Sequence, residues 1–181
     1  WIFRSDRTGT DPFGGRTVRA MMHPGYENAN TTGPAGPIDP EPSIFNVVSA
    51  DARTPIAAFA NFSMHYFGSS NGFSADYFGE VAGKIESALG SGAVAIVSQG
   101  TSGDLHWMDY SRPKRDDLTR EKYSDGLAAL AVEAIGKIEY RDDISLSMAE
   151  KRIHLKRRVP AEDRLAWAAP INQSRESRPE G

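Results

Sequence analysis

Cysteine is absent from this chain of 181 residues, and no apolar run is long enough to cross a membrane. The lack of cysteine excludes disulfide bonds and thiolate metal ligands, but it leaves the cellular compartment open. A formal net charge of -3 gives no reason to expect nucleic acid or an anionic membrane surface as a partner. Hydrophobic residues make up only 39% of the chain, and 17 glycines and 11 prolines indicate many loops.

The N-terminal part of the chain is rich in residues that favour loops. Residues 5–42 contain many Gly, Pro, Asn, Asp and Thr residues, most densely at 33–42. Successive prolines remove backbone donors and prevent a helix. We therefore expect a long irregular segment that is a functional loop or lid, or is disordered.

The middle of the chain predicts an α/β unit. Two short apolar stretches at 44–50 and 55–63 flank a turn, which predicts a β-hairpin. A helical stripe at 76–89 and a further apolar strand at 93–98 follow. Strand, helix and strand in this order predict a right-handed βαβ crossover with parallel strands. The stripe consists of Phe78, Val81, Ala82, Ile85 and Leu89.

The C-terminal third predicts a helix, a strand and a short helix. Residues 124–139 have the clearest helical periodicity of the chain. Alternating apolar residues predict a strand over 144–155, whose phase changes at a bulge near Glu150. Pro160 occupies the first turn of the short helix. The apolar set of the helix at 124–139 is Leu127, Leu130, Ala131, Ala134, Ile135 and Ile138.

These elements predict an α/β fold: a mixed, partly parallel sheet with a βαβ crossover and flanking helices, preceded by the irregular segment. Residues 1–170 are expected to be the middle portion of a larger domain, and 171–181 a disordered polar tail. We expect a fragment of a longer protein, because the chain begins at Trp1 without an initiator methionine.

Polar residues follow two of the predicted strands. His65 comes directly after the strand at 55–63, and the polar loop at 99–104 follows the strand at 93–98. Ligands of open α/β sheets bind at the carboxyl ends of parallel strands. The sequence therefore predicts a site where these two segments meet.

His65 has two interpretations. A histidine that is satisfied by the backbone is the more common case, whereas a neutral imidazole at a strand end is also a suitable zinc ligand. A catalytic zinc site needs three protein ligands, and the spacing here matches no compact motif. Further candidate ligands are His23, Asp76, Asp104 and His106.

The loop at 99–104 also has two interpretations. Its Gly-x-x-Gly step can form a backbone anion nest or oxyanion hole, or it can be a turn that needs glycine for its backbone angles. We favour the nest over a nucleophilic Ser102, because Thr-Ser-Gly is not the nucleophile-elbow motif. The apolar residues at 105–110 fit the wall of a hydrophobic cleft or ordinary packing equally well. The basic run at 151–158 is a solvated strand face or, alternatively, a lipid contact.

Four motifs occur together, namely Gly36-Pro-Ile-Asp-Pro-Glu41, Asn61-Phe-Ser-Met-His65, Phe73-Ser-Ala-Asp-Tyr-Phe-Gly79 and Ser98-Gln-Gly-Thr-Ser-Gly-Asp104. Their order and spacing, over about residues 1–158, resemble the neutral/alkaline (non-lysosomal) ceramidase family. The resemblance implies the N-terminal catalytic domain of a bacterial homologue. It also implies a zinc-dependent amidase that cleaves the N-acyl bond of ceramide.

The resemblance assigns roles to several residues. Two histidines, a glutamate and a tyrosine hold Zn²⁺ in that family, and His65 matches the second histidine. The other three ligands are implied to lie outside this chain. Arg4 falls where the family has an active-site arginine. Residues 103–106 are expected to form the floor of the site, with Gly103, Asp104 and His106 as the catalytic candidates.

One position departs from the family. His106 stands where the nucleophilic serine is expected, and Ser102 is not its equivalent. Water activated by zinc could attack directly instead, with His106 as acid/base or as an extra ligand. The substrate is then ceramide or, equally, another amide or ester.

Three functions stay open. The first is part of a zinc-dependent hydrolase, inactive in isolation because it holds too few ligands. The second is a non-catalytic module that binds a lipid or a glycan, and the third is a structural domain on a hydrolase scaffold. The resemblance implies an extracytoplasmic location, secreted or periplasmic, although these 181 residues contain no signal peptide. It also implies a lipid or small-molecule substrate and peripheral membrane contact.

Overall fold

The structure is a computed structural model, and it divides the chain into two units, Trp1–Asp142 and Asp143–Gly181. Each unit is described by itself. For residues 3–10, 16–19 and 175–176 the description covers the backbone alone. The described residues are 3–10, 16–51, 54–68, 72–90, 92–157 and 159–176.

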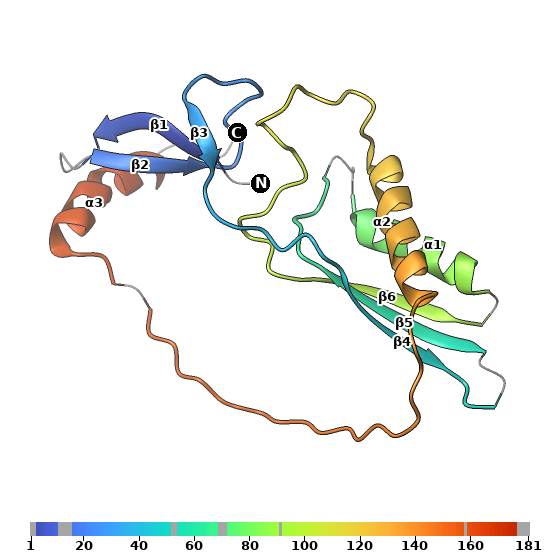
Figure 1. The fold of residues 1–181 in the computed structure, drawn as a ribbon. Coiled ribbons are helices and arrows are strands. Elements are labelled where there is room, and N and C mark those ends of the chain that lie inside the picture. Colours follow the sequence, from blue (N-terminus) through green and yellow to red (C-terminus); the bar gives the residue numbers. More distant parts are fainter. Residues whose placement is uncertain are drawn as a thin grey trace. The chain divides into compact units, whose positions relative to one another are not determined.

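Within these ranges, the first unit holds two sheets and two helices, and the second unit holds one helix (Figure 1). In chain order the elements are β1 (Phe3–Thr10), β2 (Arg16–Met21), β3 (Thr31–Pro34), β4 (Ser43–Val48), β5 (Pro55–Phe62), α1 (Asp76–Leu89), β6 (Val94–Gln99), α2 (Arg120–Ile135) and α3 (Glu162–Glu176).

The second sheet of the first unit has the order β4-β5-β6 and confirms the α/β prediction. β4 pairs antiparallel with β5, as expected for the hairpin, and β5 pairs parallel with β6 across the α1 crossover. The chain leaves α1 at Gly90, whose φ of 98° is costly for residues with a Cβ. The mixed, partly parallel sheet is therefore built from the elements that the sequence predicts.

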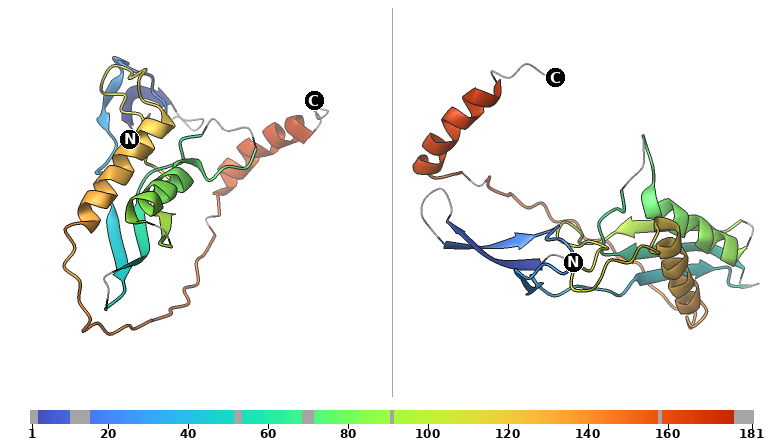
Figure 2. Two further views of the ribbon diagram at one scale, coloured as in Figure 1. Left: turned by 90° about the vertical axis from the view of Figure 1, so that its right-hand side faces the viewer. Right: turned by 90° about the horizontal axis from the view of Figure 1, so that it is seen from above.

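Helices α1 and α2 lie side by side over this sheet (Figures 1 and 2). α1 contacts β6, and α2 contacts β4. The core between them includes Tyr77, Val81 and Ile85, which are at most 1% exposed. The opposite face of the sheet exposes Phe45 and Ile96, so helices cover one face of it within the described residues.

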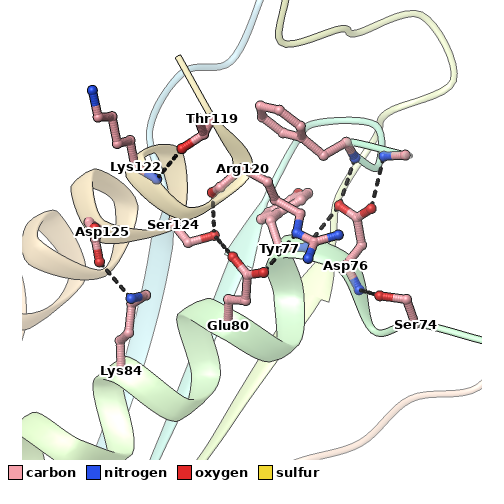
Figure 3. Close-up of polar contacts among 12 residues, drawn as sticks. Ser74, Asp76, Tyr77, Glu80, Lys84, Thr119, Arg120, Lys122, Ser124 and Asp125 are labelled. Atoms are coloured by element: carbon pink, nitrogen blue, oxygen red, sulfur yellow. Dashed lines mark hydrogen bonds and ion pairs between the residues drawn. The ribbon is translucent and has the colours of Figure 1, made fainter. Parts of the chain in front are cut away.

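A polar bridge joins the two helices (Figure 3). Arg120 Nε lies 2.7 Å from Glu80 Oε1, and the hydroxyl of Ser124 donates to Glu80 Oε2 at 2.8 Å. Ser124 is fully buried, so the bridge satisfies a hydroxyl that would otherwise cost free energy in the core. Lys84 and Asp125 add a more exposed ion pair at 2.6 Å.

The helix predicted at 124–139 begins and ends four residues earlier than expected. Thr119 is its N-cap, because the Thr119 side chain accepts a hydrogen bond from the backbone N–H of Lys122 at 3.2 Å. The predicted apolar set is wrong at two positions, Leu130 and Ala134, which are exposed. Ser124 and Ala128 are buried instead, because contact with α1 rotates the buried stripe toward the bridge.

The prediction of an irregular segment over residues 5–42 is wrong in part. Three strands form a sheet with the order β2-β1-β3, and both pairings are antiparallel. The glycines and prolines interrupt these strands rather than exclude them. Among the described residues of this segment, 22–30 and 35–42 lack strand structure. Antiparallel pairing tolerates such a composition better than a helix does.

The strand predicted over 144–155 is wrong as well. These residues form neither strand nor helix, and Leu146 and Met148 are each 90% exposed. An alternating pattern needs a neighbouring strand for its backbone donors, and the described residues provide none here. The predicted short helix is present as α3, which extends through 171–176, residues assigned above to the polar tail. No helix among the described residues combines the length and apolarity needed to cross a bilayer.

Candidate functional site

The segments that follow β5 and β6 meet, as the sequence predicts. Phe62 and Gln99 end the two strands and are register partners in the parallel pair. The backbone N–H of His65 donates to the carbonyl of Leu105 at 3.1 Å, and the Gln99 side chain donates to the carbonyl of Met64 at 3.1 Å. His65 and the loop after β6 therefore belong to one edge of the sheet.

Gly100 allows this close approach. A Cβ at Gly100 would lie 2.5 Å from Ser63 Oγ and 2.9 Å from Asn61 Oδ1. The backbone N–H of Gly100 also donates to the carbonyl of Phe62 at 2.9 Å. Neither Gly100 nor Gly103 has a positive φ. Two predictions are therefore wrong: these glycines do not form a nest of alternating right- and left-handed residues, and they do not serve a turn that needs positive φ.

Asp76 anchors the loop that carries His65 (Figure 3). Its carboxylate accepts hydrogen bonds from the backbone N–H groups of Phe67 at 2.7 Å and Gly68 at 2.9 Å. It also accepts one from Tyr77 at the start of α1, at 2.8 Å. Asp76 has a φ of 53°, which aspartate tolerates better than most residues. Its oxygens thus hold backbone, although the sequence also offered Asp76 as a metal ligand.

Tyr77 supports the same loop through a buried hydrogen bond. It is fully buried, and its hydroxyl donates to the carbonyl of Met64 at 3.2 Å. Burial raises the pKa of Tyr77 far above its usual value, with Tyr123 and Asp76 adding to the effect. Tyr77 therefore stays a neutral donor to the backbone beside His65.

His106 is buried, with 8% of its surface exposed. Its Nδ1 accepts a hydrogen bond from the backbone N–H of Met108 at 3.2 Å. Burial lowers the pKa of His106 to about 4, and the nearby His23 and His65 add to this shift. The ring is therefore neutral at pH 7, which excludes a role as a resident cation.

The structure also brings His23 to this place. The centroid of its ring lies 4.8 Å from that of His106, at an interplanar angle of 83°. His23 Nδ1 is 3.0 Å from the hydroxyl of Tyr110, and that hydroxyl donates to Met108 Sδ at 3.0 Å. The sequence offered His23 only as a third candidate ligand, because nothing in its spacing indicates contact with the loop after β6.

A cleft of about 530 Å³ opens beside His106. Most of its lining is apolar, while Arg115 and Lys122 supply positive charge and Asp39 a negative charge. Trp107 forms part of the wall and stacks on Phe67, with ring centroids 4.2 Å apart. Both interpretations of the segment at 105–110 therefore hold: it lines a cleft, and its Trp107 packs against Phe67. The apolar lining residues include Ile38, Phe62, Met64, Leu105, Leu118, Leu127 and Leu130.

Two other predicted residues lie elsewhere. Asp104 lines a smaller cavity of about 190 Å³ with Leu105 and residues 34–38, and it does not line the larger cleft. Gly103 is exposed. Arg4 belongs to β1, where its backbone pairs with Ala20 and Gly33, and its side chain lies outside the described part of the structure. Of the predicted floor at 103–106, Leu105 and His106 line the larger cleft.

The fit of these residues to zinc is partial. Among the described residues no three His, Asp or Glu side chains gather closely enough to hold a metal ion. His65 supplies an imidazole of the right chemistry, whereas the Nδ1 of His106 already accepts a hydrogen bond. The described residues therefore do not complete a zinc site by themselves.

Comparison with known proteins identifies no relative. No protein-family model matches the chain, and neither a curated protein nor a solved structure is significantly similar to it. The functional argument therefore proceeds from the geometry of this site and from the motifs of the sequence.

Proposed function

We propose that this chain is part of a zinc-dependent hydrolase similar to neutral ceramidases, cleaving an amide bond of a ceramide-like or other lipid. The observation that carries the proposal is the meeting of His65 and the His106 loop at the carboxyl ends of β5 and β6, beside an apolar cleft. Open α/β sheets place their sites at such an edge. Residues of all four ceramidase-like motifs lie near this edge. Ile38 and Met64 line the cleft, Asp76 binds the loop after β5, and Gly100 lies close to Ser63.

His65 is the proposed zinc ligand of this chain. Its loop is fixed by Asp76, as expected for a residue that must hold an ion in one position. The remaining ligands would come from other segments of a longer protein. When bound, zinc would act as a Lewis acid toward the substrate carbonyl.

The cleft supports a lipid substrate. Its volume of about 530 Å³ is in the range of small-molecule sites, and its lining is largely apolar. Arg115 and Lys122 add positive charge that suits a polar head or an acyl carboxylate. An extracytoplasmic location with peripheral membrane contact is part of the same proposal.

The test measures zinc content and amide hydrolysis in the longest natural chain that contains this sequence. We expect about one zinc ion per chain, and release of fatty acid from a ceramide with a fluorescent acyl group or from an N-acyl amino acid. His65→Ala should lose both zinc and hydrolysis. His154→Ala is the matched control, because His154 is exposed in the second unit and should change neither. A chain without zinc that cleaves none of these amides would refute the hydrolase.

A second candidate is a non-catalytic module that binds a lipid or a glycan in the same cleft. Two observations favour it: no three-residue metal group forms among the described residues, and a histidine stands where the family has its nucleophilic serine. The two functions differ in one result. A binder keeps its affinity for a fatty acid in His65→Ala, whereas the hydrolase loses its zinc.

A further inference from the structure

The outer face of the β4-β5-β6 sheet is apolar and exposed. Helices α1 and α2 lie over the other face, where Ala58, Ala60 and Ala95 are buried. Successive residues of a strand point to opposite faces, so the residues next to these alanines point away from the helices. Among them, Phe59 is 40% exposed and Ile96 is 57% exposed. Strands that pair in parallel are usually covered on both faces, so we expect a partner for this one.

The pairing register arranges the outward residues in rows that cross all three strands. The first row consists of Phe45, Phe59 and Ile96. The next row, toward the start of β5, consists of Val47, Ala57 and Val94. A polar row of Ser43, Asn61 and Ser98 borders the first row on its other side, with the Asn61 side chain donating to Ser98 Oγ at 2.7 Å. The face is therefore a row of large side chains beside a row with a small residue at its centre.

This shape is complementary to a second copy of itself. A two-fold axis that lies in the plane of contact and runs across the strands, between the two apolar rows, reverses the strand direction of the second copy. The large row of each copy then lies over the small row of the other. Phe59 lies over the partner's Ala57, the one position of the apolar rows with a single methyl group. Facing sheets of this kind pack about 10 Å apart with interdigitated side chains.

Charge and area also fit a second copy. None of the six residues in the apolar rows is charged, so pairing the face with itself desolvates no charge on either side. A large apolar side chain has roughly 200 Å² of surface, so the four that are 40–58% exposed leave about 400 Å² to cover on each copy. A standard interface buries about 800 Å² on each partner, a little more than half of it apolar. The face supplies an apolar area close to what such an interface needs.

We propose that the outer face of the β4-β5-β6 sheet is the interface of a symmetric homodimer, in which Phe59 of each copy packs over the partner's Ala57. The interface is separate from the cleft beside His106. That cleft is lined from α2, which lies over the opposite face of the sheet, so the dimer leaves it open.

Analytical ultracentrifugation of the longest natural chain that contains this sequence, at 1–200 μM, tests the dimer. The apolar area is at the lower end for specific interfaces, so we expect dissociation at about 1–50 μM. Phe59→Glu places one carboxylate of each copy in the apolar interface and should weaken the dimer at least about 100-fold. A monomer up to about 200 μM would overturn the proposal and leave the face to another segment of a longer protein. A dimer that Phe59→Glu does not weaken would overturn it too.

Two further variants show that the effect belongs to this face. Phe73→Glu is the matched control, because Phe73 is fully exposed and lies outside the sheet, and it should leave the dimer unchanged. Phe45→Glu changes the edge strand at a residue that is 58% exposed, and it should weaken the dimer as well. Circular dichroism shows which variants fold, and Phe45→Glu decides the result if Phe59→Glu does not. Equal dimerisation of Phe45→Glu and Phe73→Glu would contradict the proposed interface.

An exchange of the two central residues tests the two-fold packing itself. Ala57→Phe places a large ring opposite Phe59 of the partner subunit and should weaken the dimer about tenfold or more. Adding Phe59→Ala moves the small residue into the other row and should restore the affinity to within about threefold of the unmodified chain. A double variant as weak as Ala57→Phe alone would refute the placement of Phe59 over the partner's Ala57.

The dimer and the hydrolase fail in different ways. A monomeric chain that binds zinc and cleaves an amide refutes the dimer alone. A dimer that is weakened by Phe59→Glu but holds no zinc and cleaves nothing refutes the hydrolase alone. His65→Ala should dimerise as the unmodified chain does, because His65 lies in the loop after β5 and outside the apolar rows.

Discussion

The loops after β5 and β6 reach the same edge of the sheet, but different forces hold them. The loop after β5 is fastened by a charge, since the carboxylate of Asp76 accepts three backbone hydrogen bonds. The loop after β6 is fastened by buried rings, with His106 8% and Tyr110 6% exposed. Each loop delivers one histidine.

The comparison separates two ways of positioning a functional side chain. A carboxylate that binds backbone N–H groups fixes a loop by directional contacts and is sensitive to the removal of one side chain. A loop held by desolvated rings tolerates small polar changes but is sensitive to any change that charges a buried ring. The expected effects of mutation and of pH therefore differ between the two loops.

Replacement of Asp76 is expected to have the largest effect. Asp76→Ala leaves the backbone N–H groups of Phe67 and Gly68 without their acceptor, and alanine tolerates the φ of 53° less well than aspartate does. We expect a loss of about 3–4 kcal/mol in the free energy of unfolding. Asp76→Asn keeps one acceptor oxygen and should lose about 1–2 kcal/mol. Urea denaturation followed by circular dichroism measures both.

The matched control is an exposed carboxylate whose contact is an ion pair within its own loop. Asp116 is exposed and pairs with Lys114 at 2.7 Å, so Asp116→Asn should change stability by less than about 0.5 kcal/mol. Equal stability of Asp76→Ala and Asp116→Asn would show that the first loop is not held by its carboxylate.

The crossover unit could be predicted from the sequence because its signals are local. Two contiguous apolar strands and a helical stripe, ended by Gly90, specify β5, α1 and β6 without reference to distant residues. The strand predicted over 144–155 rested on an equally regular pattern, yet it has no neighbour to pair with among the described residues. Periodicity therefore predicts which face a strand would bury, but not whether a partner exists.

The site could be predicted in its location but not in its contacts. The chain order placed His65 and the loop after β6 at one edge. The contact of His23 with His106 depends on how distant segments fold together, and the bond from Met108 depends on the local backbone of an irregular loop. Neither of these two contacts produces a periodic pattern in the sequence. The same limit explains why Gly100 was assigned to an anion nest rather than to close packing.

Substitution of Gly100 tests how much the contact between the two loops contributes to stability. Gly100→Ala would place a Cβ 2.5 Å from Ser63 Oγ, so the strand ends must separate. We expect a loss of about 2–3 kcal/mol in the free energy of unfolding. Gly103→Ala is the control, because a Cβ there meets nothing within 4 Å and its φ is not positive. If the two variants have the same midpoint of urea denaturation, the close approach at Gly100 does not contribute to stability.

A change of pH is expected to affect the loop after β6, which is held by buried rings, through the protonation of His106. Burial lowers the pKa of His106 to about 4 in the folded chain, whereas an exposed histidine in the unfolded chain has a pKa near 6.5. Between these values the unfolded state binds a proton that the folded state does not. The contribution of His106 to stability therefore falls as pH decreases from about 6.5 to about 4, and it is constant above this range. Relative to His106→Gln, which cannot titrate, the unmodified chain should lose about 2 kcal/mol more between pH 7.5 and pH 5. Urea denaturation in the presence of EDTA measures this difference. Parallel pH profiles for the two chains would mean that the ring of His106 is hydrated and that burial does not position the second loop.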